Sequence, residues 1–220
     1  MLNFEIVEIV FLGIVFLISI SIHEFSHAYV SHQLWDPTPK IQWRVSSNPL
    51  KHIDILGFVF VFLINFWWWK PVTTNPVYYK RPLRDQFLVA IAGPFSNIIL
   101  AVLWVFVVAL YWIITGIENP VILYHYEDLF LQFFFIFSII NIILALFNLL
   151  PLPPLDWFRI IKFFNPELAK KIESYLLYIL IWIIIILIIP WVGENIGIFL
   201  YSVGEKIFEI LFVIVTWLLY

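Results

Sequence analysis

Residues 4–34 read FEIVEIVFLGIVFLISISIHEFSHAYVSHQL, an apolar run that leads directly into two histidines and a glutamate. The run from Phe4 to Ile22 predicts a membrane-spanning helix, because about 20 apolar residues are needed to cross the hydrocarbon core. We expect helical structure to continue to about Leu34, since Asp36-Pro37-Thr38-Pro39 then ends it. Ionisable side chains are costly in such a helix, and their presence therefore indicates a functional site.

The composition of the whole chain also indicates a membrane protein. Hydrophobic residues make up 63% of the 220 residues and charged residues 12%, whereas a soluble domain has about a quarter charged residues. The formal net charge of -3 gives no argument for nucleic-acid binding. The chain has no cysteine, which excludes disulfides and thiolate metal ligands. The lipid bilayer is therefore an expected partner, and the sequence leaves the oligomeric state open.

Four further apolar segments predict membrane-spanning helices, because each approaches or exceeds the length that a crossing requires. They are Phe87–Thr115, which Gly93-Pro94 interrupts near its start, Leu129–Leu150, Tyr175–Trp191 and Ile196–Tyr220. A shorter run of about 15 residues, Ile55–Trp69, predicts a re-entrant segment. The chain is therefore expected to cross the membrane about five times.

Two segments between the apolar runs have other patterns. Ile41–Val45 alternates in polarity, which is typical of a short strand, and Arg159–Lys171 has the pattern of an amphipathic surface helix. The predicted fold is an all-α polytopic membrane protein with about five spanning helices, a re-entrant segment and a small β-like element. We expect a single integral membrane domain over residues 1–220, with a core at about 4–160 and accessory C-terminal helices at about 172–220.

The loop charges predict how the chain is oriented. By the positive-inside rule, connections rich in lysine and arginine lie on the cytoplasmic side. Three connections are basic, namely those with Lys40, Arg44 and Lys51, with Lys70, Lys80, Arg81 and Arg84, and with Arg159, Lys162, Lys170 and Lys171. The N-terminus is then outside, and His23 and His27 lie in the half of the membrane nearer the cytoplasm.

The spacing of His23, Glu24 and His27 predicts a zinc site. Residues four apart share one face of a helix, so both imidazoles can reach one ion, while Glu24 is displaced toward the open coordination position. Catalytic zinc needs a third protein ligand, and the best candidate is Asp156, which follows the proline-rich end of a predicted span. Loop charge and motif position place Asp156 and the two histidines at a similar depth.

Four segments together make the chain resemble the site-2 protease family of intramembrane zinc metalloproteases (peptidase family M50), in its compact form without a PDZ domain. They are His23–His27, Ala92–Asn97, Asn148–Asp156 and Asn48–Asp54. The resemblance covers about residues 15–160. It implies a prokaryotic cell-membrane enzyme that hydrolyses peptide bonds in the transmembrane segments of other proteins, as in regulated intramembrane proteolysis.

The resemblance also implies roles for individual residues. His23, His27 and Asp156 would hold one Zn²⁺ ion, Glu24 would be the general base, and Asn148 would hold the substrate backbone or the tetrahedral intermediate. Three further residues are possible substrate contacts or site-lining residues, namely His52, Gly93 and Asn97. For His52 a hydrogen-bonded loop histidine is the alternative, and for Gly93 and Asn97 a structural role in helix packing.

One departure from the family pattern bears on activity. Trp157 and Phe158 stand where the family usually has two glycines, which permit tight turning and close approach of the backbone. The alternative function is therefore a catalytically inactive membrane scaffold or binding protein of the same family. A di-iron oxygenase also uses the His-x-x-x-His pattern, but its ligand set needs about eight histidines, and the chain has 5.

Overall fold

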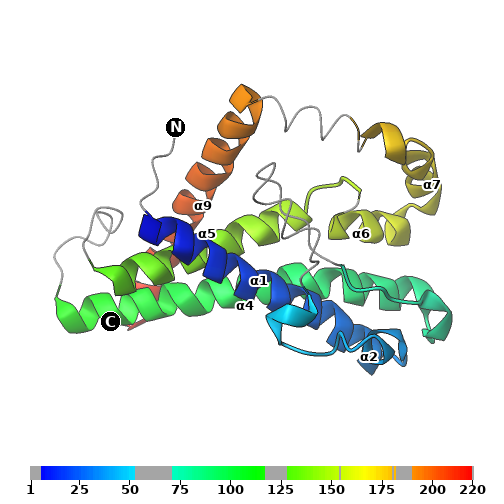
Figure 1. Cartoon of the computed structure of the whole chain (residues 1–220), viewed down its shortest axis with the longest axis horizontal. Helices are drawn as coiled ribbons and strands as arrows, with labels where there is room; N and C mark the ends of the chain where they lie inside the picture. The colour runs from blue at the N-terminus through cyan, green and yellow to red at the C-terminus, as the bar shows by residue number, and fades with distance from the viewer. Residues whose placement is uncertain are drawn as a thin grey trace. The chain divides into compact units, whose positions relative to one another are not determined.

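The computed structural model describes residues 6–52, 71–116, 128–153, 155–179, 181 and 190–219, and all secondary structure in these ranges is helical. The α-helices are α1 (Ile6–Gln33), α2 (Thr38–Ile41), α4 (Pro82–Thr115), α5 (Leu129–Asn148), α6 (Asp156–Phe164), α7 (Pro166–Ser174) and α9 (Pro190–Leu219) (Figure 1). Two short 3-10 helices, η1 (Pro49–Lys51) and η2 (Pro76–Tyr78), lie in the connections. The all-α prediction is confirmed for these residues.

Three helices of the described chain, α1, α4 and α5, are long and apolar enough to cross a membrane. Only 28% of the most apolar window of α1 and 22% of that of α4 is buried inside the protein, so their outer faces are suited to lipid. The predicted count of about five spans is not confirmed by the described residues. About half of the predicted span at 175–191 lies outside the described residues, and the predicted re-entrant segment at 55–69 lies wholly outside them. The C-terminal helix forms as α9, but Glu205, Lys206 and Glu209 make it too charged to join these three.

Other predictions of local structure were wrong, and each has a local cause. Ile41–Val45 is not a strand, because α2 ends at Ile41 and the chain then turns through Trp43 at a φ of 58°. The predicted helix Arg159–Lys171 is two helices, because Asn165 ends α6 and Pro166 begins α7, where its missing N–H is tolerated. Conversely, α4 continues through Gly93 and Pro94.

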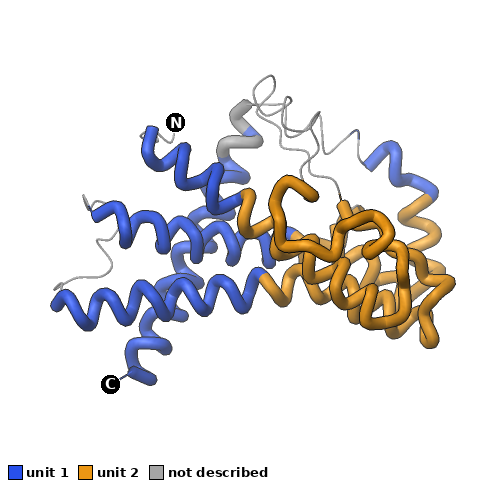
Figure 2. The backbone as a smooth tube through the Cα atoms, turned by 60° about the horizontal axis from the view of Figure 1, so that its bottom comes forward, with its two compact units in different colours: residues 1–16, 97–147, 174–220 blue, residues 17–96, 148–173 orange. Residues whose placement is uncertain are grey.

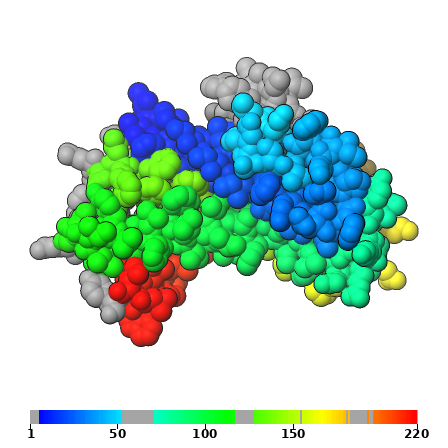
Figure 3. Space-filling view, turned by 90° about the horizontal axis from the view of Figure 1, so that it is seen from below, coloured from blue at the N-terminus to red at the C-terminus, as the bar shows by residue number. Residues whose placement is uncertain are grey.

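The chain forms two compact units (Figure 2). Unit 1 comprises residues 1–16, 97–147 and 174–220, and its core is a cluster of apolar side chains from α4, α5 and α9, including Val105, Leu131, Ile139 and Phe208. Figure 3 shows the C-terminal part of α9, in red, against the green surface of α4. This unit is mainly a packed apolar bundle.

Unit 2 comprises residues 17–96 and 148–173, and it contains most of the buried polar side chains. Asp36, which is 0% exposed, accepts hydrogen bonds from the Ser31 hydroxyl at 2.8 Å, the Thr38 N–H at 2.9 Å and the Asn75 N–H at 2.7 Å. Burial raises the pKa of Asp36, but these hydrogen bonds outweigh it and hold the pKa below its usual value. Asp36 thereby ties the end of α1 to the non-helical segment before η2.

Candidate metal centre

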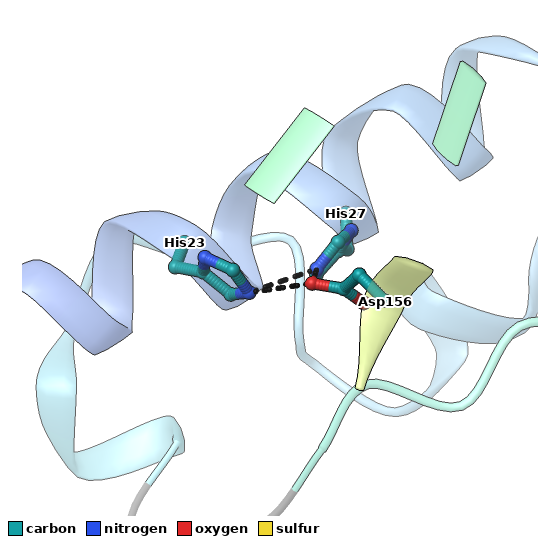
Figure 4. Close-up of side chains that lie close together, drawn as sticks. All are labelled: His23, His27 and Asp156. Carbon is teal, nitrogen blue, oxygen red and sulfur yellow. Dashed lines mark hydrogen bonds and ion pairs between the residues drawn. The ribbon is translucent and has the colours of Figure 1, made fainter. Parts of the chain in front are cut away.

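His23 and His27, one turn apart on α1, converge with Asp156, the first residue of α6 (Figure 4). Asp156 Oδ2 lies 3.0 Å from His23 Nε2 and 3.1 Å from His27 Nε2, and the two Nε2 atoms are 3.1 Å apart. All three side chains are buried, with exposed fractions of 2%, 3% and 7% for the residues. The three predicted ligands are therefore brought together, although they come from distant parts of the sequence.

The hydrogen bonding of His27 orients its Nε2 toward Asp156. Nδ1 of His27 lies 2.6 Å from the Val89 carbonyl oxygen, which can only accept, so Nδ1 carries the proton and donates it. Nε2 of the same ring faces Asp156 Oδ2, 3.1 Å away, and it is the nitrogen that could bind a metal ion. Burial raises the pKa of Asp156, but the neighbouring His27 and His23 outweigh it, and the pKa lies well below the usual 3.8. Either a proton on Nε2 or a metal ion bound between the imidazoles and the carboxylate would satisfy these atoms, so the arrangement suits a cation.

The spacing of the three atoms fits zinc. Ligand atoms about 2.0–2.2 Å from a tetrahedral zinc ion lie roughly 3.3–3.6 Å from one another. The observed separations of 3.0 to 3.1 Å need only a small outward shift of the side chains. Three protein ligands also leave the fourth position for water, as in catalytic zinc sites.

Gly93 of α4 lies directly against the two imidazoles. A Cβ atom at this position would be 2.4 Å from Nε2 of His27 and 2.6 Å from Nε2 of His23. Such contacts would force the histidines or the helix to move. Gly93, predicted as a possible site-lining residue, is therefore placed at the metal-facing atoms, where only a hydrogen side chain fits.

Glu24 is buried beside the candidate ligands and is held by the backbone. Its Oε2 accepts a hydrogen bond of 2.8 Å from the Val72 N–H, and the residue is 3% exposed. Val72 belongs to the same non-helical segment that Asp36 binds through Asn75. The carboxylates of Glu24, on α1, and Asp36, just after it, therefore both bind this segment.

His52 and Arg44 of unit 2 both interact electrostatically with Glu24. Nε2 of His52 donates to the Ser46 carbonyl at 2.7 Å, and its Nδ1 is buried without a partner among the described residues. Burial lowers the pKa of His52, and Arg44 lowers it further, whereas the Ser46 carbonyl and Glu24 raise it. His52 is 1% exposed, so it is a buried, hydrogen-bonded loop histidine with an electrostatic influence from Glu24.

The two predicted asparagines have different places. Asn148 ends α5 and is buried at 4% exposure in unit 2, the unit that contains the histidines. Asn97 belongs to unit 1, where its amide donates to Asn141 at 2.8 Å, and Asn141 in turn donates to the Phe137 carbonyl. The environment of Asn97 is that of a buried helix-packing contact.

Trp157 and Phe158 lie in the first turn of α6, where the backbone is helical. Neither residue has the positive φ that would favour glycine, since Trp35 and Trp43 are the non-glycine residues of the described chain that do. Phe158 is buried, and Lys162 Nζ lies 5.3 Å from the centre of its ring. The two aromatic residues are therefore compatible with Asp156 lying beside both histidines.

Unit 2 contains a groove of about 270 Å³. It is lined by Val72, Thr73, Thr74 and Pro76, by Gln86 and Val89 of α4, and by Arg159 and Lys162 of α6. Val72 and Val89 connect the groove to the candidate centre, because their backbone groups bind Glu24 and His27. The two charged lining side chains are both cationic, and Lys162 also pairs with Glu173.

Comparison with known proteins agrees with this geometry. Residues 11–189 match the model described as Peptidase family M50. The chain belongs to peptidase family M50. It is 39% identical over 169 residues to "Putative zinc metalloprotease YwhC" of Bacillus subtilis, a match that covers 75% of each chain. It is 25% identical over 180 residues to "Putative zinc metalloprotease Rip2" of Mycolicibacterium smegmatis, covering 79% of this chain and 65% of that protein. No solved structure gave a significant match.

Membership of family M50 confirms the resemblance found in the sequence and identifies the expected metal as zinc. The described residues contain no PDZ domain, in agreement with the compact form. With its apolar helices, this M50 chain is a membrane protein.

The sequence did not reveal that the backbone groups of Val72 and Val89 bind Glu24 and His27. Every residue has these backbone groups, so residue identity does not indicate which of them reach the site. The sequence also did not predict that Arg44 is buried, because a single arginine in a basic loop is ordinarily exposed.

Proposed function

We propose that this protein is an intramembrane zinc endopeptidase that cleaves transmembrane segments of other membrane proteins, as in regulated intramembrane proteolysis. The observation that carries the proposal is the convergence of His23, His27 and Asp156 beside Glu24 in a buried site, with Gly93 packed against the two imidazoles. Catalytic zinc sites use this kind of ligand set with a neighbouring glutamate. The substrate is a transmembrane protein, and the lipid bilayer is the second partner.

His23, His27 and Asp156 would hold the zinc ion, and the other side chains would handle protons and the substrate. Zinc, when bound, lowers the pKa of a water molecule toward about 7 and polarises a carbonyl group. Glu24 takes the proton of the attacking water and returns it to the amine nitrogen of the departing peptide. Asn148 donates a hydrogen bond to the oxygen of the scissile carbonyl as negative charge develops on it.

The substrate segment must be locally unwound, because the carbonyls of an intact helix are already hydrogen-bonded. We infer that the unwound backbone lies in the groove along residues 72–76. Support comes from the groove's position, since Val72 and Val89 bind Glu24 and His27 directly. Ile41–Val45, predicted as a short strand, offers no strand edge for such a backbone, because it does not form a strand.

The chain is proposed to be a multi-pass protein of a prokaryotic cell membrane, with the site toward the cytoplasmic side. The basic residues of the connections support this orientation through the positive-inside rule. Many of these basic residues belong to segments of unit 2, the unit that also contains the candidate metal centre. Water reaching the site from the cytoplasm would supply the nucleophile.

The deciding experiment compares the wild type with Glu24→Gln and Asp156→Ala, purified in detergent, on a panel of single-span substrates. Zinc content is measured on the same samples. We expect Glu24→Gln to retain zinc and lose cleavage, and Asp156→Ala to lose both. Glu167→Gln, at an exposed position of α7, is the matched control and should behave as the wild type.

Equal cleavage by the wild type and Glu24→Gln would refute the proposed mechanism. Full zinc occupancy of the wild type without cleavage of any substrate would instead favour the inactive scaffold. The structure gives that alternative less support than the sequence did, because Trp157 and Phe158 lie in a regular helix and leave Asp156 3.0 Å from His23.

A further inference from the structure

Arg44 is a buried cation outside the candidate ligand group. It follows α2, is 3% exposed, and donates from Nη1 to the Lys51 carbonyl and from Nη2 to the Pro71 carbonyl, the latter at 3.2 Å. Burying a guanidinium group is costly unless its charge and its donors are compensated. Its role in the protein therefore requires an explanation beyond the general basic character of the loop.

The Pro71 carbonyl that Arg44 binds belongs to the same peptide group as the Val72 N–H. That N–H donates to Glu24 Oε2 at 2.8 Å. One peptide group thus separates the cation of Arg44 from the carboxylate of Glu24, with its carbonyl bound to the cation and its N–H bound to the anion. Hydrogen bonds in such a chain polarise and strengthen one another.

Electrostatics supports the same connection. Burial lowers the pKa of Arg44, and the charge of Glu24 acts in the opposite direction and so favours the charged form of Arg44. With Oε2 held by Val72, Oε1 of Glu24 is the oxygen left for proton transfer. A carboxylate that must accept and return a proton benefits from a fixed orientation, since a displacement of about 1 Å can cost on the order of 100-fold in rate.

We propose that Arg44 is a positioning residue that orients Glu24 for proton transfer by fixing the Pro71–Val72 peptide group. The role rests on the proposed function, in which Glu24 is the proton acceptor. It requires an arginine, because two carbonyls are bound from two nitrogens of one planar guanidinium group. A lysine keeps the charge but presents a single nitrogen.

The first test measures the backbone directly, without reference to activity. Amide hydrogen exchange at single-residue resolution is recorded for zinc-loaded wild type, Arg44→Met, Arg44→Lys and Glu24→Gln. We expect faster exchange of the Val72 amide in Arg44→Met and Glu24→Gln, with a smaller change in Arg44→Lys. The Asn75 amide, which Asp36 binds, should exchange at the wild-type rate in all four proteins.

The second test measures zinc content, kcat and KM on a single-span substrate. Arg44→Met should retain zinc and KM and lose kcat by on the order of 100-fold, with partial recovery in Arg44→Lys. In the Glu24→Gln background, Arg44→Met should cause no further loss. Lys51→Met is the matched control, because Lys51 is exposed and Arg44 contacts its main-chain carbonyl.

Unchanged Val72 exchange in Arg44→Met, or faster exchange with unchanged kcat, would overturn the proposal. If the Asn75 amide also exchanges faster in Arg44→Met, the substitution has unfolded the segment. The Arg44→Lys variant then decides, again by Val72 amide exchange and by kcat. Cleavage by Glu24→Gln at the wild-type rate would refute the proposed function separately, and Val72 exchange would still show whether Arg44 holds the peptide group.

Discussion

A Cβ atom on Gly93 would lie 2.4 Å from Nε2 of His27. Atoms that are not bonded to each other do not approach so closely, so α4 can pass the candidate metal centre only because this residue is glycine. Close approach of two backbones is a recognised use of glycine. Here the approach is to the metal-facing nitrogen of a candidate ligand.

Gly93→Ala is therefore expected to weaken zinc binding by on the order of 10- to 100-fold, the range typical of residues that support metal ligands. Zinc affinity is measured by competition with a chelator. Gly13→Ala, on the helix that carries the histidines, is the control, since no atom lies within 4 Å of its added Cβ. Wild-type zinc affinity in Gly93→Ala would contradict the close contact.

Replacing Trp157 and Phe158 with glycine, the usual family residues, is expected to destabilise the protein without raising its activity per bound zinc. Both positions are helical, and glycine in a helix costs about 1 kcal/mol relative to alanine. Removing the buried Phe158 ring adds about 3–5 kcal/mol. Thermal unfolding in detergent measures the effect. Phe164→Ala, at a position 71% exposed, should cost much less. A gain in specific activity would show that the aromatic pair restrains the enzyme.

His52 should make the protein less stable in acid. Its pKa is lowered in the folded state, chiefly by burial, from the usual 6.5. The unfolded chain therefore takes up a proton at a higher pH than the folded chain does. The contribution of His52 to the free energy of unfolding is fully present above pH 6.5. It is lost as the pH falls from 6.5 through the lowered pKa of the folded state.

Thermal unfolding of zinc-saturated wild type and His52→Gln, at pH values on both sides of 6.5, tests this expectation. The difference in stability between the two proteins should shrink as the pH falls. Because zinc binding is itself pH-dependent in both proteins, the comparison rests on their difference. A difference that stays constant with pH would rule out His52 as the titrating group.

The cationic lining of the groove predicts a charge preference in the substrate. Arg159→Glu should slow cleavage of substrates with an acidic residue near the scissile bond by about fivefold, since a partly exposed ion pair contributes up to ~1 kcal/mol. Cleavage of an otherwise identical neutral substrate should change little. Lys170→Glu, on the exposed side of α7, reproduces the charge change outside the groove. Equal effects of the two variants, or of the two substrates, would exclude the groove as the substrate path.

Much of this protein follows from local sequence. The apolar runs that become α1, α4 and α5 are recognisable because crossing a bilayer demands length and hydropathy, both of which are written in consecutive residues. The pairing of His23 and His27 is also local, since four residues are close to one helical turn. The sequence-based predictions were wrong where a short segment can form either a strand or a turn. In Ile41–Val45, a turn at Trp43 replaces the expected strand.

The sequence by itself therefore determined the helical membrane character, the M50 family and the three candidate ligands. Only the tertiary structure decided what surrounds them: Gly93 against the imidazoles, Val89 fixing the tautomer of His27, and the Arg44–peptide–Glu24 connection. The reason is physical. These contacts join residues far apart in the chain, and several use backbone atoms that every residue has, so residue identity does not reveal them.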